Sequence, residues 1–182
     1  MKAISEAFSG MGIATMRFNF PFKEDGLARV DSQAVSTATV KAAVEYVTAN
    51  YPPPLFLGGH SFGGRMASHA VIDHGLNVAG MIFCSFPLHP RGKPSTARAE
   101  HLAAIRQPML FLSGTRDALA EPELLGRTVT AVGAKQEWLE TAAHGYGLSL
   151  IHISEPPSPL YRSYAVLCLK KKRGGGGGGG GG

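Results

Sequence analysis

The sequence predicts an α/β fold, with a mostly parallel sheet covered by helices on both faces. Short apolar runs alternate along the chain with longer segments of helical periodicity, which is the pattern of repeated strand-helix-strand units. Runs such as 108–113 are almost continuously apolar, as expected of strands that are buried on both faces. Residues 1–147 are long enough for a single domain with one core, and nothing in them suggests two.

The expected elements follow from periodicity and from helix start and stop signals. Val40, Ala43, Val44 and Val47 form an apolar stripe at helical spacing, and Asp31 or Ser32 can cap that helix. Gly75 is a plausible end for a later helix. In chain order we expect helix 3–8, strand 13–20, helix 32–50, strand 55–58, helix 63–74, strand 78–86, strand 108–113, helix 121–132 and strand 136–140.

A Gly-x-Ser-x-Gly motif at 59–63 carries the strongest chemical signal. It follows an apolar strand and opens a helix, the context of a nucleophile elbow, in which a serine sits on a sharp strand-to-helix turn. Gly59 and Gly63 supply positions without side chains beside that turn. We therefore expect Ser61 to be an acyl-transfer nucleophile and the Phe62 N–H to face the developing oxyanion. A chance match in a glycine-rich loop is the alternative.

Two partners for this serine lie further along the chain. Asp117 falls just past the 108–113 strand and His144 just past the 136–140 strand, where open parallel sheets place their sites. A serine hydroxyl needs an imidazole to take its proton, and the imidazole needs a carboxylate to fix its tautomer. Asp117 could instead cap a turn and His144 could be a surface histidine. Glu121 and Glu140 are the fallback acids.

Other polar residues suggest weaker site assignments. His89 and Lys93 lie in the loop after the 78–86 strand, on the expected side of the site, so they could bind substrate or simply be solvated. Arg65 could hold a substrate anion, although pairing with a nearby carboxylate is the favoured interpretation. His69 and His74 are spaced wrongly for a shared metal on one helix face, and we expect no metal and no organic cofactor.

At this point the chain resembles the α/β-hydrolase family, in particular its small dienelactone-hydrolase-like and NSL-complex-subunit-like branch. The resemblance covers residues 1–147 and rests on five segments. It implies a serine hydrolase without a cofactor that acts on a small-molecule acyl substrate, and it leaves the substrate undefined. The segments are 12–21, 58–68, 87–94, 114–117 and His144.

Both ends of the sequence depart from that family pattern. Family members begin with a strand that leads into a His-Gly loop. The strand lies in the sheet between the strands at 13–20 and 55–58, and a backbone N–H of the loop is the second oxyanion donor. Neither is present before the first helix, so we expect Met1 to be an internal methionine. The loss of one oxyanion donor costs roughly a hundredfold to a thousandfold in rate. We therefore expect this fragment to be poorly active.

Residues 148–182 are expected to be a non-native, disordered tail. Residues 148–156 can be back-translated as CTG TCT CTT ATA CAC ATC TCC GAG CCC, a transposase mosaic end used in DNA library preparation. Residues 163–172 stand close to an adapter end running into poly-A, and the final glycines fit poly-G. The alternative is a flexible glycine linker behind a basic patch.

Charge and cysteine content limit the expected partners. The formal net charge is +5, but most of it comes from the tail, so the body is close to neutral and indicates no nucleic-acid partner. Cys84 lies in an apolar strand and reads as a small buried residue, so a cytoplasmic location is the default. There is no apolar run long enough to span a bilayer, and the oligomeric state stays open.

The sequence therefore predicts a serine hydrolase that cleaves an ester, thioester or lactone through an acyl-Ser61 intermediate. His144 would act as base and then acid, and Asp117 would orient it. The competing hypothesis is a non-catalytic interaction scaffold with the same fold, because fold alone does not establish activity.

Overall fold

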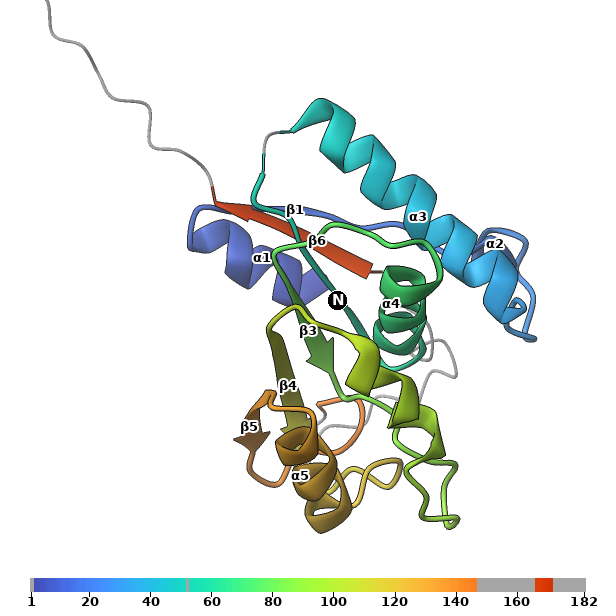
Figure 1. The fold of residues 1–182 in the computed structure, drawn as a ribbon, viewed down its shortest axis with the longest axis vertical. Coiled ribbons are helices and arrows are strands. Elements are labelled where there is room, and N and C mark those ends of the chain that lie inside the picture. The colour runs from blue at the N-terminus through green and yellow to red at the C-terminus, as the bar shows by residue number, and fades with distance from the viewer. Residues whose placement is uncertain (1, 52, 147–165, 172–182) are drawn as a thin grey trace, which may run out of the picture.

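The computed structural model describes residues 2–51, 53–146 and 166–171. Its elements follow the expected alternation of helices and strands (Figure 1). They are α1 (Lys2–Gly10), β1 (Ile13–Met16), α2 (Pro21–Glu24), α3 (Gln33–Asn50), β2 (Phe56–His60), α4 (Phe62–Asp73), β3 (Gly80–Cys84), the 3-10 helix η1 (Ala97–Ala104), β4 (Met109–Gly114), α5 (Pro122–Ala131), β5 (Lys135–Leu139) and β6 (Val166–Lys171).

One sheet contains all the described strands, in the order β1-β6-β2-β3-β4-β5. The strands β2, β3, β4 and β5 are parallel neighbours, joined by crossovers through helical segments. Their carboxyl ends therefore meet at a single edge of the sheet, where open α/β sheets carry their sites. This arrangement confirms the α/β class with a mostly parallel sheet.

The strand β6 occupies the interior position between β1 and β2. It is antiparallel to both, pairing Ala14 with Lys170 and Gly58 with Leu167. A segment of the expected tail thus fills the position for which the sequence analysis found no strand. The sequence analysis expected disorder throughout 148–182, whereas the structure describes 166–171 as a strand, and the unpaired backbone groups at the edge of β2 offer hydrogen bonds to such an extended segment. The rest of the expected tail lies outside the described residues.

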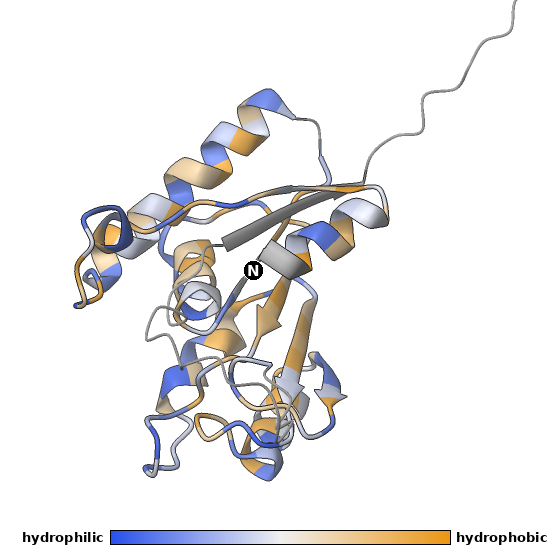
Figure 2. Ribbon diagram, turned by 180° about the vertical axis from the view of Figure 1, so that it is seen from behind, coloured by the Kyte–Doolittle hydropathy of each residue, from blue (hydrophilic) through white to orange (hydrophobic). Residues whose placement is uncertain are grey.

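Helices cover both faces of the sheet. Figure 1 shows α3 and α4 on one side of the sheet and α1 on the other. The stripe of α3 predicted to be core is buried at Val40, Val44 and Val47, and the Ser32 side chain caps the helix by accepting the Val35 N–H at 3.3 Å. Figure 2 shows the central strands as largely hydrophobic, while α3 alternates between hydrophobic and hydrophilic positions.

Some boundaries differ from the sequence expectation. The first strand ends at Met16 instead of residue 20, because Pro21 opens the short helix α2 and Phe20 turns inward to pack against Phe22 and Phe62. The 3-10 helix η1 lies in a stretch expected to be loop. Gly75 ends α4 with a φ of 60°, as predicted. Within the described residues, no helix is long and apolar enough to cross a membrane.

Candidate active site

Ser61 lies on a strained turn between β2 and α4. Its φ is 53° and its ψ is −120°, a conformation that residues with a Cβ rarely adopt. The turn closes because two glycines meet: a Cβ on Gly59 would lie 2.6 Å from the Gly64 nitrogen, and one on Gly64 would lie 2.7 Å from the Gly59 oxygen. The motif pointed to Gly59 and Gly63; the Gly63 backbone does lie against Gly59, with its carbonyl carbon 2.7 Å from the Cβ position, and the contact also requires a glycine at position 64, which the motif does not include.

Ser61, His144 and Asp117 form a continuous chain of hydrogen bonds. The His144 Nε2 lies 2.7 Å from the Ser61 Oγ, and the His144 Nδ1 lies 2.8 Å from the Asp117 Oδ2. With the proton on Nδ1, the imidazole donates to the carboxylate and accepts from the serine hydroxyl. The Asp117 side chain is shielded from solvent and also accepts the Leu119 N–H at 2.8 Å. The structure thus brings together the three residues expected to be catalytic.

The loops that carry Asp117 and His144 are fixed to each other. The Arg116 N–H donates to the Ala142 carbonyl at 2.9 Å, and the Thr141 N–H donates to the Thr115 hydroxyl oxygen at 2.9 Å. A Cβ on Gly114 would come within 2.1 Å of the Ala142 oxygen. The spacing between the acid and the base is therefore set by backbone contacts at the ends of β4 and β5.

Two further residues hold the histidine loop, and the sequence analysis missed both. The His60 Nε2 lies 2.7 Å from the His144 carbonyl oxygen, and burial lowers the pKa of His60 to about 4. His60 is therefore neutral near pH 7 and donates its Nε2–H to that carbonyl. The Tyr146 hydroxyl donates to the Leu112 carbonyl at 2.7 Å, and its ring packs against His60. Their positions beside Ser61 and His144 were the available signal.

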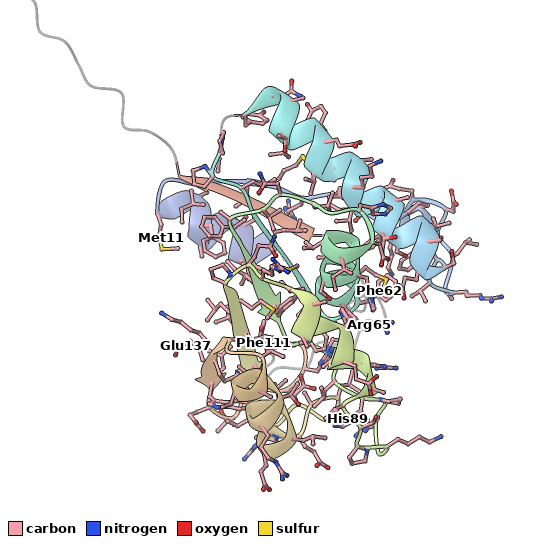
Figure 3. The ribbon with its side chains drawn as sticks, in the orientation of Figure 1. Met11, Phe62, Arg65, His89, Phe111 and Glu137 are labelled. Atoms are coloured by element: carbon pink, nitrogen blue, oxygen red, sulfur yellow. The ribbon has the colours of Figure 1, made fainter. Side chains whose placement is uncertain are left out.

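Phe62 begins α4, so its N–H points out of the first turn without an intrahelical acceptor. The helix dipole adds partial positive charge at the same place, immediately after the serine. Figure 3 shows Phe62 and Arg65 together at the start of α4, with His89 further toward the loop after β3. The Phe62 amide is thus available for an anion formed at Ser61.

A cleft of about 1010 Å³ opens over Ser61 and His144. Its walls come from α2 and the segment after it, the loop after β3, the start of η1 and the loop after β4. The lining combines apolar side chains with three cations. The residues lining the cleft are Phe22, Lys23, Gly26, Leu27, Ala28, Val30, Ser61, Pro90, Arg91, Arg98, Ala118, Leu119 and His144.

His89 and Lys93, the expected substrate-binding residues, do not line this cleft. His89 is buried, with Nδ1 2.9 Å from the Pro90 carbonyl and Nε2 accepting the Glu121 N–H at 3.3 Å. Both of its nitrogens are therefore engaged with backbone, and it holds the loop in place. Lys93 is exposed at a turn of the same loop. The loop's contribution to the cleft comes from Pro90 and Arg91 instead.

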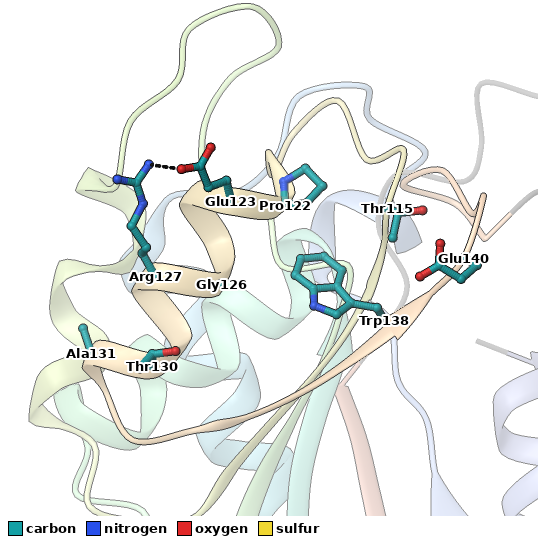
Figure 4. Close-up of a pocket in the computed structure, with 9 residues that line it drawn as sticks. All are labelled: Thr115, Pro122, Glu123, Gly126, Arg127, Thr130, Ala131, Trp138 and Glu140. Carbon is teal, nitrogen blue, oxygen red and sulfur yellow. Dashed lines mark ion pairs between the residues drawn. The ribbon is translucent and has the colours of Figure 1, made fainter.

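The fallback acids lie apart from the histidine. Glu121 is exposed at the start of α5. Glu140 lines a separate hollow of about 710 Å³ between α5 and β5, together with Thr115 and Trp138 (Figure 4). That hollow contains none of the three triad residues, so Asp117 is the acid that the geometry provides.

Arg65 and Cys84 have local roles that the geometry defines. No carboxylate in the described part of the chain pairs with Arg65, and burial together with the nearby Arg98 lowers the pKa of Arg65. The ion pair between Arg65 and a carboxylate that the sequence analysis favoured is thus not formed among the described residues. Cys84 is buried and its pKa is raised by burial, as expected for a small core residue. The described residues contain no cluster of three or more His, Cys, Asp or Glu suited to a metal.

Solved structures share this fold. An α/β serine hydrolase homologue from Coxiella burnetii matches with a TM-score of 0.51 at 21% identity, over 65% of this chain and 54% of that one. A protein of unknown function from Agrobacterium tumefaciens matches with a TM-score of 0.53 at 16% identity, over 66% of this chain and 56% of that one. The chain thus corresponds to little more than half the length of either protein.

A third match is a monoacylglycerol lipase from Paleococcus ferrophilus, with a TM-score of 0.51 at 15% identity, over 63% of this chain and 67% of that one. At such identities the likeness concerns the fold alone. Membership rests on the sequence itself, because a family model described as an alpha/beta hydrolase domain matches residues 1–151. That match covers the elbow and both partner loops, and the chain belongs to the α/β-hydrolase domain family.

Proposed function

We propose that this protein is a serine hydrolase that cleaves an ester, thioester or lactone through an acyl-Ser61 intermediate. The observation that carries the proposal is the unbroken hydrogen-bond chain from Asp117 through His144 to Ser61, with contacts of 2.8 and 2.7 Å. Such a chain activates a hydroxyl that is otherwise a weak nucleophile at neutral pH. Its opening onto a large cleft gives an acyl group access to Ser61.

In this mechanism His144 takes the Ser61 proton as the hydroxyl oxygen attacks the substrate carbonyl, and then returns that proton to the leaving group. Asp117 keeps the Nδ1 proton in place and stabilises the imidazolium that forms. A water molecule, activated by His144 in the same way, then releases the acyl group from Ser61. Each step needs His144 within hydrogen-bond reach of the serine oxygen.

The oxyanion formed during attack would be held by the Phe62 N–H at the start of α4. Two donors usually share this role, and one donor is worth roughly a hundredfold to a thousandfold in rate. With the Phe62 N–H as its donor, the site should still catalyse the reaction, but more slowly than a site with two donors. We keep the dienelactone-hydrolase-like branch and the adapter origin of residues 148–182 as parts of this proposal, since they rest on sequence resemblance.

Labelling with a fluorophosphonate probe tests the proposal directly. The probe should modify the chain covalently, and Ser61→Ala should abolish the label, because the hydroxyl oxygen is the atom that forms the bond. Ser113→Ala is a matched control, since Ser113 is buried at the end of β4 and does not line the cleft. Circular dichroism should show both variants folded.

A folded chain that takes no label would overturn the proposal. The competing function, a non-catalytic scaffold with a hydrolase fold, would then be favoured. Label that persists in Ser61→Ala would place the nucleophile elsewhere and would equally count against the acyl-Ser61 mechanism.

A further inference from the structure

The cleft above Ser61 carries an unbalanced charge. Three cations line it, and they come from separate elements: Lys23 from α2, Arg91 from the loop after β3 and Arg98 from η1. No Asp or Glu is among the residues that line the cleft. The body of the chain is close to neutral overall, so this concentration of positive charge is local to the candidate active site.

None of these three cations forms an ion pair with a carboxylate in the described part of the chain. Ion pairs between described Lys or Arg residues and carboxylates lie elsewhere, on α3 and α5. Near Lys23, Glu24 accepts the Asn19 side-chain amide at 2.7 Å and Asp31 accepts the Phe22 N–H at 3.1 Å, while Lys23 itself lies 5.6 Å from the centre of the Phe22 ring. Arg91 and Arg98 are therefore the two cations most available to a ligand.

Arg98 and Arg65 reinforce this field. Both are partly buried, and repulsion from Arg98 contributes to the lowered pKa of Arg65. Two guanidinium groups held near each other without a described carboxylate cost free energy unless an anion binds beside them. Guanidinium groups also offer the planar, two-pronged donor geometry that suits carboxylate and phosphate oxygens.

We propose that the substrate of this site carries an anionic group, a carboxylate or a phosphate, that Arg91 and Arg98 bind while its acyl carbonyl lies at Ser61. Lys23 adds to the same field from α2, which forms another wall of the cleft. The apolar part of the lining, which includes Leu27, Val30 and Leu119, contacts the part of the substrate between its anionic group and its acyl carbonyl. This inference rests on the proposed serine hydrolase function and specifies its substrate class.

Matched substrate pairs separate the two possible sources of the anion. The carboxylate arm compares mono-4-nitrophenyl glutarate with neutral 4-nitrophenyl hexanoate. The phosphate arm compares the butyryl thioester of phosphopantetheine with that of pantetheine. We expect kcat/KM to favour the anionic member of at least one pair by roughly tenfold, with the preference falling as salt is raised. The arm with the larger preference identifies the group.

Variants assign the preference to the cleft. Arg91→Gln and Arg98→Gln should each lower the preference several-fold, mainly by raising the KM of the anionic member of the pair. Arg106→Gln is the control, since Arg106 is exposed and does not line the cleft. Arg106→Gln removes one positive charge, as the two cleft variants do, so an effect of the protein's overall charge would appear in this control as well.

A binding measurement keeps this proposal distinct from the catalytic one. In the Ser61→Ala chain, which cannot form the acyl intermediate, calorimetry should show tighter binding of the anionic member of the favoured pair, and Arg98→Gln should remove the difference. Fluorophosphonate labelling together with equal turnover and equal binding of both members would overturn the anionic substrate while leaving the serine hydrolase in place. Loss of labelling would instead remove the function on which the inference rests.

Discussion

The two halves of the sheet differ in how they are built. In one half, β2, β3, β4 and β5 are parallel, and the segments that follow three of them carry Ser61, Asp117 and His144. In the other half, β1 and β2 are joined through the antiparallel β6, from the far end of the sequence. The difference teaches that the candidate chemistry and the closure of the sheet depend on separate parts of the chain.

Their local contacts differ in the same way. The parallel half fixes its loops through backbone contacts that leave no room for a Cβ, as at Gly59, Gly64 and Gly114. In the described part of the other half, β1 is short and partly exposed. Gly12, which directly precedes β1, has no atom within 4 Å of the position that a Cβ would take, so the backbone there is not tightly packed. Substitutions in the first half should therefore affect reactivity most, and those in the second half should affect stability most.

The largest effect on reactivity short of removing the nucleophile is expected from Asp117→Asn. The amide can still accept the Leu119 N–H through its oxygen, so the loop should keep its shape. The change removes the charge that stabilises the imidazolium and favours the wrong tautomer of His144, for a loss of about 10⁴-fold in kcat. Steady-state kinetics on a 4-nitrophenyl ester, together with a thermal melt, measures both quantities.

Asp117→Asn with nearly full activity and an unchanged melting temperature would contradict the role given to Asp117. Glu140→Gln provides the comparison, because Glu140 is the nearest alternative acid in the sequence but lines a different hollow. It should leave kcat unchanged.

The parallel half could be predicted from sequence because its signals are local. A Gly-x-Ser-x-Gly motif after an apolar strand, and an Asp and a His each directly after a strand, define positions that parallel topology then brings to one edge. The same reasoning did not find His60 or Arg98. Their roles depend on a contact with the His144 carbonyl and on the walls of the cleft, which arise only when distant segments meet.

The antiparallel half resisted prediction for a different reason. Pairing of 166–171 with both β1 and β2 is a long-range contact that no local pattern specifies. The adapter-like back-translation of 148–182 argued for a disordered tail, and that match carries no information about how the segment could pair within the sheet. The sequence analysis expected the sheet to lack a strand between the two flanking strands, and β6 lies at that position.

An intermediate effect, on stability rather than reactivity, is expected from Leu167→Pro. Leu167 pairs with Gly58 of β2, and proline removes the backbone donor from an interior strand. The free energy of unfolding should fall by about 1 to 3 kcal/mol, measured by urea denaturation. Leu167→Ala keeps the backbone N–H and should retain the strand pairing.

The reactivity of the remaining folded protein sharpens this comparison. Fluorophosphonate labelling per folded molecule should be unchanged in Leu167→Pro, because the triad loops follow the parallel strands. Unchanged stability would mean that β6 contributes nothing to the sheet in solution. A labelling rate that falls in parallel with stability would show instead that the two halves are coupled.

The smallest effect is expected at His60, which acts on His144 through its backbone. In His60→Ala the His144 carbonyl loses its donor, and kcat should fall roughly two- to tenfold with KM unchanged. His60→Gln offers an amide N–H at a similar reach and should restore most of the rate. A KM change without a kcat change would place His60 in substrate binding and contradict this positioning role.

Acid titration gives His60 a readout that loss of packing alone would not produce. The pKa of His60 is lowered from 6.5 to about 4 by burial, so between these values the unfolded chain binds more protons than the folded one. His60 therefore makes stability decline as pH falls from 6.5 toward 4. His60→Gln removes that titration, and the pH dependence of its unfolding free energy should be shallower in this window. It should not vanish, because His101, whose pKa burial also lowers to about 4, titrates in the same range.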